Sequence, residues 1–202
     1  LALLYAIGFL GLIYFYNPAK TADAAAVGVI FDETKDPFQQ GKNPADQRPP
    51  FSGEYFYNES LPVAFGDWSW GVRNDWASSE AAYEGSFSAK IRFLQQWAGA
   101  RIAASDIDVS GYDGISLAVN PDSSVGDIYL TLFDTYGHEL GRQSLSWYAP
   151  SGTLPANTWT VVRVPFSTLF PAGQKMRDIT GLSIGSDNPG VAYIDSIHLE
   201  QS

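Results

Sequence analysis

The stretch GISLAVNPDSSVGDIYLTLF, residues 114–133, decides the fold class. It holds two short runs rich in Val, Ile, Leu and aromatic residues, 114–120 and 127–133, on either side of the turn signal Asn120-Pro121-Asp122. Short runs of this composition, bounded by turn-forming residues, favour β-strands. We therefore predict two strands here, joined by a short connection.

The same pattern extends over most of the chain from residue 51 onward. Turn-forming Gly, Pro, Asn, Asp and Ser separate eight further candidate strands: 54–58, 68–73, 87–93, 100–103, 143–147, 158–165, 181–185 and 192–199. Residues 166–170 have room for one helical turn, and no long amphipathic helix is indicated after residue 50. Many short strands at regular spacing predict an all-β fold, an antiparallel β-sandwich or barrel.

The composition excludes several classes of function. The formal net charge is −10, and residues 51–202 carry 17 acidic and 8 basic side chains. Such a surface repels phosphate backbones, so we expect no nucleic-acid partner, whereas neutral ligands and divalent cations are compatible with it. The absence of cysteine removes disulfides, thiol catalysis and Cys-type zinc sites. His138 and His198 are far apart in sequence and match no metal-ligand spacing.

The first sixteen residues, LALLYAIGFLGLIYFY, carry no charge. As a helix this run spans roughly 24 Å, somewhat less than the hydrocarbon core of a bilayer at about 30 Å. We predict a single transmembrane helix over residues 1–17, an extended proline-containing linker over 18–50, and the β-domain over 51–202. A cleaved signal peptide and a buried apolar helix remain the alternatives.

Sequence signatures of enzymes are missing. The chain has no GxSxG, no HExxH and no phosphate-binding loop. Paired carboxylates for sugar hydrolysis would have to come from the 17 acidic residues of the domain, and no pair stands out. We expect no catalytic residues, and glycoside hydrolysis ranks last among the functions considered.

Tryptophan and tyrosine form a more informative set. Trp68 and Trp70 flank Ser69, so in a strand both rings project from one face. An exposed ring is a platform for the apolar face of a sugar, while nearby polar side chains meet its hydroxyl groups. The candidate ligand-binding residues are Trp70, Arg73, Trp76, Gln95, Trp97, Trp147 and Tyr148. For Trp68, Trp159 and Phe133 we expect packing in the core, the commoner fate of large aromatic side chains.

Seven segments occur in an order that resembles a known family. They are YNESL at 57–61, DWSW at 67–70, YEGSFSAKI at 83–91, VSGYDGISL at 109–117, WTVVRVPF at 159–166, ITGLSI at 179–184 and VAYIDSIHL at 191–199. In this order they resemble landmarks of the non-catalytic, jelly-roll carbohydrate-binding modules of the galactose-binding-domain-like superfamily. The resemblance covers about residues 54–200 and implies an antiparallel jelly-roll β-sandwich. It implies less about function, because this fold carries many tasks.

Such modules often hold one structural calcium ion near the chain ends. The ligands that the resemblance implies are Glu59, Glu84, Ser86 and Asp195, together with backbone oxygens of the turn 83–88. Oxygen ligands and a negative site suit Ca²⁺. This sequence departs from the commonest pattern, because Asp195 is followed by Ser196 and Glu59 is preceded by Asn58. We expect one structural Ca²⁺ at most, and no other cofactor.

Two functions follow as hypotheses. The first is a membrane-anchored binding module for a glycan or polysaccharide, on the extracytoplasmic side, periplasmic or extracellular. The second is a non-catalytic accessory subunit of a larger membrane complex, in which the β-sandwich contacts protein partners and Gly8 and Gly11 allow close helix packing. A carbohydrate binder needs several aromatic side chains exposed in a groove, whereas a subunit needs a broad buried patch.

Overall fold

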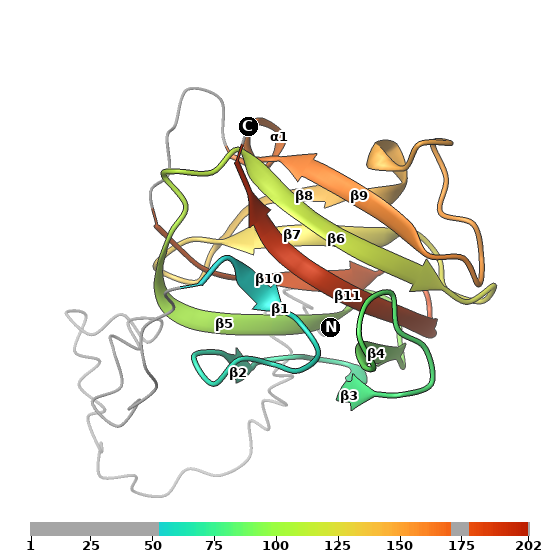
Figure 1. The fold of residues 1–202 in the computed structure, drawn as a ribbon. Coiled ribbons are helices and arrows are strands. Elements are labelled where there is room, and N and C mark those ends of the chain that lie inside the picture. Colours follow the sequence, from blue (N-terminus) through green and yellow to red (C-terminus); the bar gives the residue numbers. More distant parts are fainter. Residues whose placement is uncertain (1–52, 171–177, 202) are drawn as a thin grey trace, which may run out of the picture. The chain divides into compact units, whose positions relative to one another are not determined.

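Strands make up most of the chain that the computed structural model describes, residues 53–170 and 178–201 (Figure 1). They form two antiparallel sheets that pack face to face, so the prediction of an antiparallel all-β sandwich is confirmed. The transmembrane helix predicted at 1–17 and the linker predicted at 18–50 lie outside the described residues. Among residues 53–170 and 178–201, no helix is long and apolar enough to cross a membrane.

The first sheet has the strand order β3-β4-β11-β6-β9, with β1 alongside β11. Its strands are β1 Tyr55–Tyr57, β3 Val72–Ser78, β4 Ser88–Phe93, β6 Gly114–Pro121, β9 Thr160–Pro165 and β11 Gly190–Glu200. The second sheet has the order β2-β5-β10-β7-β8. Its strands are β2 Gly66–Asp67, β5 Ala98–Asp108, β7 Ile128–Phe133, β8 Glu139–Ser144 and β10 Asp178–Ser186. Two short helical turns complete the described elements: η1 Leu145–Tyr148, and α1 Phe166–Leu169, which confirms the turn predicted at 166–170.

The connectivity places strands side by side that are distant in sequence. From β4 to β7, and again from β8 to β11, the chain crosses to the other sheet at every connection. Gly114 of β6, for example, pairs with Pro165 on one side and with Glu200 on the other. This arrangement is consistent with a jelly roll.

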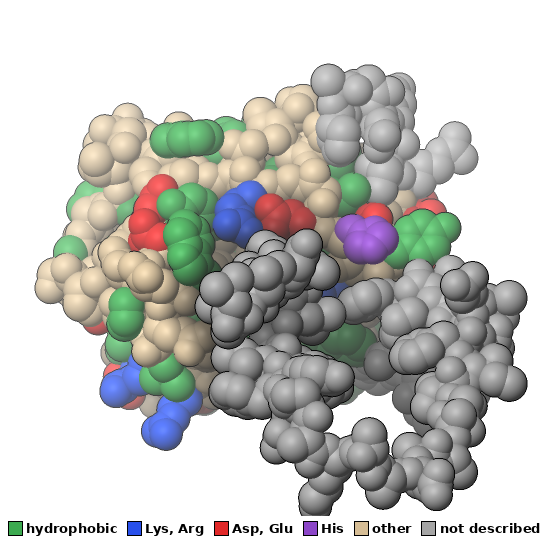
Figure 2. Space-filling model, turned by 180° about the vertical axis from the view of Figure 1, so that it is seen from behind, with side chains coloured by type: hydrophobic (Ala, Val, Ile, Leu, Met, Phe, Trp, Pro, Cys, Tyr) green, Lys and Arg blue, Asp and Glu red, His purple; other side chains and the backbone are tan. Residues whose placement is uncertain are grey.

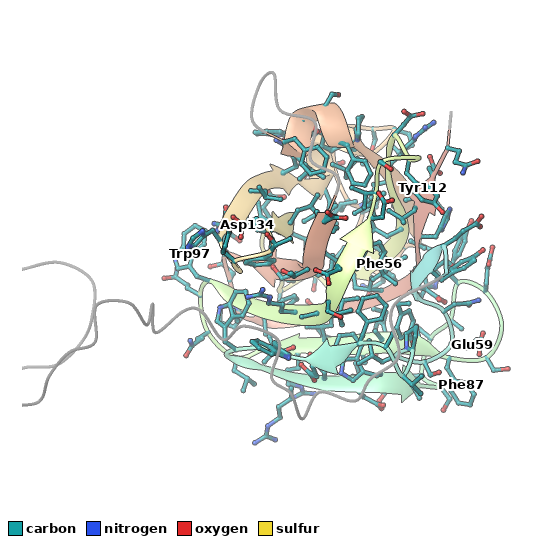
Figure 3. All side chains as sticks on the ribbon, turned by 90° about the vertical axis from the view of Figure 1, so that its left-hand side faces the viewer. Phe56, Glu59, Phe87, Trp97, Tyr112 and Asp134 are labelled. Atoms are coloured by element: carbon teal, nitrogen blue, oxygen red, sulfur yellow. The ribbon has the colours of Figure 1, made fainter. Side chains whose placement is uncertain are left out.

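The core lies between the sheets and is built from alternate residues of each strand. In β7, the side chains of Ile128, Leu130 and Leu132 are fully buried, while Tyr129 and Thr131 between them belong to the opposite face of the sheet. Phe56 lies between the two layers (Figure 3). Burying each aliphatic side chain of this size stabilises the fold by about 1.5–3 kcal/mol, so the alternation fixes the register and decides which residues reach the outer face.

One predicted strand, 68–73, does not form as a single strand. β2 ends at Asp67 and β3 begins at Val72, and Gly71 between them has a φ of +64°, which interrupts the extended backbone. The segment between β2 and β3 is therefore a loop that carries Trp68 and Trp70. It is anchored to β5 by the backbone bridge of Trp70.

The strand predicted at 143–147 is also wrong in its second half, because β8 ends at Ser144 and η1 follows. The hydroxyl groups of Ser144 and Ser146 both donate to the carboxylate of Asp127, at 2.8 and 2.5 Å. Side-chain hydrogen bonds of this kind compete with strand pairing and turn the chain. Trp147 consequently lies on a helical turn rather than on a strand.

Candidate functional site

A shallow groove with a volume of about 150 Å³ lies on the outer face of the five-stranded sheet. Its floor contains part of a cross-strand row in which the strand pairing aligns Ser183 of β10, Thr131 of β7 and Arg142 of β8. Residues aligned in this way project from the same face of the sheet. The floor is therefore polar, and the row continues beyond the groove lining to Arg101 of β5, which is aligned with Ser183.

Glycines occupy the next row of the floor. Gly99 of β5 and Gly185 of β10 are aligned with Tyr129 of β7. Because Gly99 has no side chain, the indole of Trp70 lies directly on β5, and a β-carbon at Gly99 would come within 2.5 Å of the Trp70 ring. Gly99 thus makes room for the indole of Trp70 on the face of the sheet.

Trp97 stands at the edge of the groove, in the loop between β4 and β5. It is 59% exposed, and its ring centroid is 6.4 Å from that of Tyr129. Its carbonyl oxygen accepts a hydrogen bond from the indole Nε1 of Trp70 at 2.7 Å. The backbone of Trp97 has a φ of +59°, a conformation that bulky residues rarely adopt. Backbone strain held by surrounding contacts is typical of functional sites.

The loop between β2 and β3 is organised by the carboxylate of Asp67. It accepts hydrogen bonds from the backbone N–H of Ser69 at 3.0 Å, from Nδ2 of Asn74 at 3.2 Å and from the indole of Trp76 at 2.8 Å, and the Ser69 hydroxyl also donates to it. Burial by itself raises the pKa of Asp67, but these hydrogen bonds outweigh it and lower the pKa. Their contribution to stability is therefore present at neutral pH and is lost as pH falls through the lowered pKa.

The hairpin between β7 and β8 borders the same face. The carboxylate of Asp134 accepts hydrogen bonds from the backbone N–H groups of Tyr136 and His138, at 2.9 and 2.8 Å. This tight turn presents the ring of Tyr136, which is 63% exposed. Figure 3 shows Trp97 and Asp134 on one side of the sandwich, and Glu59 on the other.

Charged side chains accompany the aromatic rings on this face. Arg142 pairs with Glu139, with 2.8 Å between Nη2 and Oε2. The guanidinium carbon of Arg101 lies 3.8 Å from the ring centroid of Phe133 and 5.9 Å from that of Trp68. Figure 2, seen from behind, shows basic, acidic and hydrophobic side chains next to one another on this side of the molecule.

Three of the predicted ligand-binding residues lie in the groove or beside it. Trp70 and Trp97 line it. Gln95 is exposed in the loop before β5, where its side chain packs close to Gly71. Arg73, by contrast, is an exposed residue of β3 in the six-stranded sheet and is not part of this face.

The other three predicted residues lie outside the groove lining. Trp76 lines a small cavity in the core and donates from its indole to Asp67, so it supports the loop between β2 and β3. Trp147 is 74% exposed on η1. Tyr148, its neighbour, donates from its hydroxyl to Oγ1 of Thr168 at 2.9 Å.

The expectation that Trp68 packs in the core is wrong, because 53% of this residue is exposed and its ring faces Arg101. The cause is the early end of β2, which leaves Trp68 in a loop on the groove face. Phe133 is buried, but it is covered by the Arg101 guanidinium on the outer face of the sheet, where it lines the groove. Trp159 is half-buried, with its ring 5.9 Å from that of Tyr83.

Sequence reasoning missed Tyr129, Thr131 and Ser183 as groove residues, and Arg101 as a residue beside the groove. A signal for the first two was present, because they alternate with fully buried aliphatic residues in the run IYLTLF. Arg101 and Ser183 carry no such local signal. Arg101 lies next to the groove residue Ser183 only because β5 and β10 pair in this register, which places the two residues opposite one another.

The four residues that the resemblance implies as calcium ligands come together around one loop, between β3 and β4. The carboxylate of Glu59 accepts hydrogen bonds from the backbone N–H groups of Ser86 at 2.9 Å and Phe87 at 3.2 Å. The fully buried carboxylate of Asp195 accepts from the N–H of Glu84 at 3.2 Å and from that of the preceding residue at 2.9 Å. Both carboxylates therefore hold this loop through hydrogen bonds from its backbone N–H groups. Among the described residues, no group of three or more acidic, His or Cys residues could hold a metal ion.

Removal of calcium should therefore leave the stability of the domain unchanged. We expect the thermal midpoints in excess CaCl₂ and in excess EDTA to differ by less than about 1 °C, because the loop is held by hydrogen bonds within the chain. Near-ultraviolet circular dichroism on heating measures the midpoint. A specific site filled at 100 times its Kd would add about 2.7 kcal/mol, so a rise of about 5 °C or more in calcium would contradict this prediction.

No protein-family model and no curated protein matches this sequence. Solved structures share its fold. The family 30 carbohydrate-binding module of a cellulosomal cellulase of Clostridium thermocellum matches with a TM-score of 0.57 at 13% identity, over 74% of this chain and 96% of that one. The family 11 module from the same organism, in complex with a β-1,3-1,4-mixed-linked tetrasaccharide, matches with a TM-score of 0.52 at 13% identity, over 74% and 95%.

A third structure with a similar fold is a β-1,2-glucanase from Parabacteroides distasonis. It matches with a TM-score of 0.54 at 11% identity, over 76% of this chain and only 26% of the glucanase. Sequence identities this low establish a shared fold but do not establish a shared function or ligand. The chain therefore has the jelly-roll β-sandwich fold of carbohydrate-binding modules.

Proposed function

We propose that this chain is a carbohydrate-binding module and that the groove on its five-stranded sheet binds a polysaccharide. The observation that carries the proposal is the placement of Trp70, Trp97 and Tyr129 around a floor of polar residues and glycines. A sugar ring has apolar C–H faces and a polar edge. The aromatic rings therefore cover the faces, while Ser183 and Thr131 meet the hydroxyl groups.

The chemistry of the groove favours binding over hydrolysis. Glycoside hydrolysis needs two carboxyl groups on either side of the scissile bond, about 5–9.5 Å apart. Among the described residues that line the groove, Glu139 is the one carboxylate, and it is paired with Arg142. This donor set supports a non-catalytic role, as does the fold shared with the family 30 and family 11 modules.

The exposed aromatic side chains also favour a glycan over a protein partner. An accessory subunit would present a broad apolar patch. Here Trp68, Trp70 and Trp97 are exposed together on the groove face, next to charged side chains. This combination suits a ligand with alternating apolar and polar surfaces.

We further propose that residues 1–17 anchor the module in a membrane, with the β-domain on the extracytoplasmic side. The support is the uncharged apolar run at 1–16. The linker over 18–50 would give the domain reach from the bilayer. This part of the proposal rests on the sequence alone.

Native gels cast with polysaccharide test the binding function. The full chain, kept in a polyoxyethylene detergent rather than a sugar-headed one that would compete for the groove, is run through gels that contain mixed-linkage β-1,3-1,4-glucan, β-1,2-glucan, xylan or galactomannan. We expect retardation relative to a non-binding reference protein in at least one gel. Unchanged relative mobility in every gel would contradict the proposal.

A further inference from the structure

Arg101 of β5 lies beside the groove on the outer face of the five-stranded sheet, next to Ser183. Its guanidinium carbon is 3.8 Å from the ring centroid of Phe133 and 5.9 Å from that of Trp68. Within residues 53–170 and 178–201, its buried Nε has no hydrogen-bond partner, and no ion pair forms with the guanidinium. Arg142, in the same cross-strand row, differs because it pairs with Glu139 at 2.8 Å.

An unpaired and partly buried guanidinium is costly, because the charge loses water without gaining a partner. Burial lowers the pKa of Arg101, yet an arginine side chain stays protonated at neutral pH. The two neighbouring rings stabilise the cation by cation–π contact. Because Nε is buried, the two Nη groups are the donors that can meet a ligand.

We propose that Arg101 recognises an oxyanion on the bound glycan, either the carboxylate of a uronic acid or a sulfate ester. The N–H donors of a guanidinium form a planar fork that matches two oxygens of one oxyanion, and such charge-assisted pairs are the stronger hydrogen bonds. A neutral hydroxyl group would accept from one donor and leave the charge unpaired. The proposal rests on the proposed function and narrows its ligand to an acidic glycan.

The charge of the rest of the domain limits how acidic that glycan is. Residues 51–202 carry 17 acidic and 8 basic side chains, so a polymer with a charge on every sugar would be repelled. In the cross-strand row, Ser183 and Thr131 stand between Arg101 and the paired Arg142. One oxyanion at Arg101, beside the groove, thus fits next to neutral hydroxyl groups within it, as in a polysaccharide with spaced acidic substituents.

Calorimetric titration with matched pairs of polysaccharides tests the inference. One pair is glucuronoxylan and its carboxyl-reduced form, and the other is a sulfated galactan and its desulfated form. Neutral mixed-linkage glucan, xylan and galactomannan report on binding in general. We expect the wild-type chain to bind one acidic form at least tenfold more tightly than its neutral counterpart at physiological ionic strength. The pair that shows the difference identifies the oxyanion.

Variants of Arg101 separate recognition from folding. Arg101→Met keeps the length of the side chain and its packing on Phe133, and should reduce the preference for the acidic form to less than twofold. Arg101→Lys keeps the charge without the fork and should retain only part of the preference. Arg92→Met is the matched control, because Arg92 is an exposed arginine of β4 in the other sheet, and it should keep the full preference. Circular dichroism checks that each variant is folded.

The outcomes distinguish this inference from the proposed function. Equal binding of the acidic and neutral forms by the wild-type chain, or an unchanged preference in both Arg101 variants, overturns the role of Arg101 and leaves polysaccharide binding in place. An equal loss of preference in Arg92→Met shows a general charge effect and also overturns it. No binding to any acidic or neutral polysaccharide overturns both proposals.

Discussion

Trp97→Ala is expected to weaken polysaccharide binding by about 30-fold, the equivalent of about 2 kcal/mol for the loss of a central aromatic contact. The ring is 59% exposed in the free protein, so a sugar can cover it, and its removal empties no part of the core. The contact to Trp70 runs through the Trp97 carbonyl oxygen, which alanine retains. Calorimetric titration with a polysaccharide that binds the wild-type chain measures the loss.

Trp147→Ala provides the matched control for this experiment. Trp147 is 74% exposed on η1 and lies outside the groove lining, so its replacement also removes one exposed indole but should change affinity by less than twofold. Thermal midpoints of both variants should stay close to that of the wild-type chain, because surface truncations of this kind change stability little. Equal weakening by the two variants, or a stronger effect of Trp147→Ala, would place the binding surface elsewhere.

Local patterns were sufficient to predict the fold class of this chain. Runs such as GISLAVN and DIYLTLF became β6 and β7 because their alternate aliphatic residues are buried between the sheets. The predictions failed where a side chain overrides the backbone preference. Asp67 accepts a hydrogen bond from the hydroxyl group of Ser69, and the strand predicted at 68–73 is a loop in its first part. Asp127 accepts hydrogen bonds from two serine hydroxyl groups of the strand predicted at 143–147, whose second half is a helical turn.

The candidate site was less accessible to sequence reasoning. Trp70 and Trp97 could be nominated because exposed aromatic side chains near strand ends are common in binding sites. Whether a tryptophan faces the core or the solvent depends on where its strand ends and how it pairs, which explains why Trp68, in the loop after β2, is exposed although it was expected in the core. Arg101 is brought to Ser183 by the order of the sheet, and no local pattern encodes that order.

The two sides of the sandwich differ in the role that we expect for them: one binds the ligand, and the other stabilises the fold. On the groove side, Arg101 forms no ion pair within the described part of the chain, and a partly buried charge without a partner reduces stability. On the other side, Glu59 and Asp195 bind the loop between β3 and β4 through its backbone N–H groups (Figure 3). Changes on this second side should therefore affect stability while leaving the groove intact.

Asp195→Ala is expected to lower the free energy of unfolding by about 3 kcal/mol or more. The carboxylate of Asp195 is fully buried in the irregular part of β11, where its two oxygens accept hydrogen bonds from the backbone N–H groups of Tyr83, Glu84 and Ser196 at 2.9, 3.2 and 2.7 Å. Alanine leaves these three backbone N–H donors without an acceptor and removes the hydrogen bonds that hold the loop between β3 and β4 to β11. For a domain of this size the thermal midpoint should fall by about 6–12 °C, as measured by near-ultraviolet circular dichroism.

Asp75→Ala is the control, because Asp75 is exposed on β3 and accepts one hydrogen bond, from the N–H of Ala77 at 3.1 Å. Its loss should cost less than about 1 kcal/mol, since water can replace the acceptor. Polysaccharide affinity of Asp195→Ala, measured well below its midpoint, should equal that of the wild-type chain, because the groove lies on the other sheet. Equal stability of Asp195→Ala and Asp75→Ala would contradict this prediction. It would mean that water or a rearranged loop satisfies the three N–H groups, and that the hydrogen bonds between this loop and β11 do not stabilise the domain.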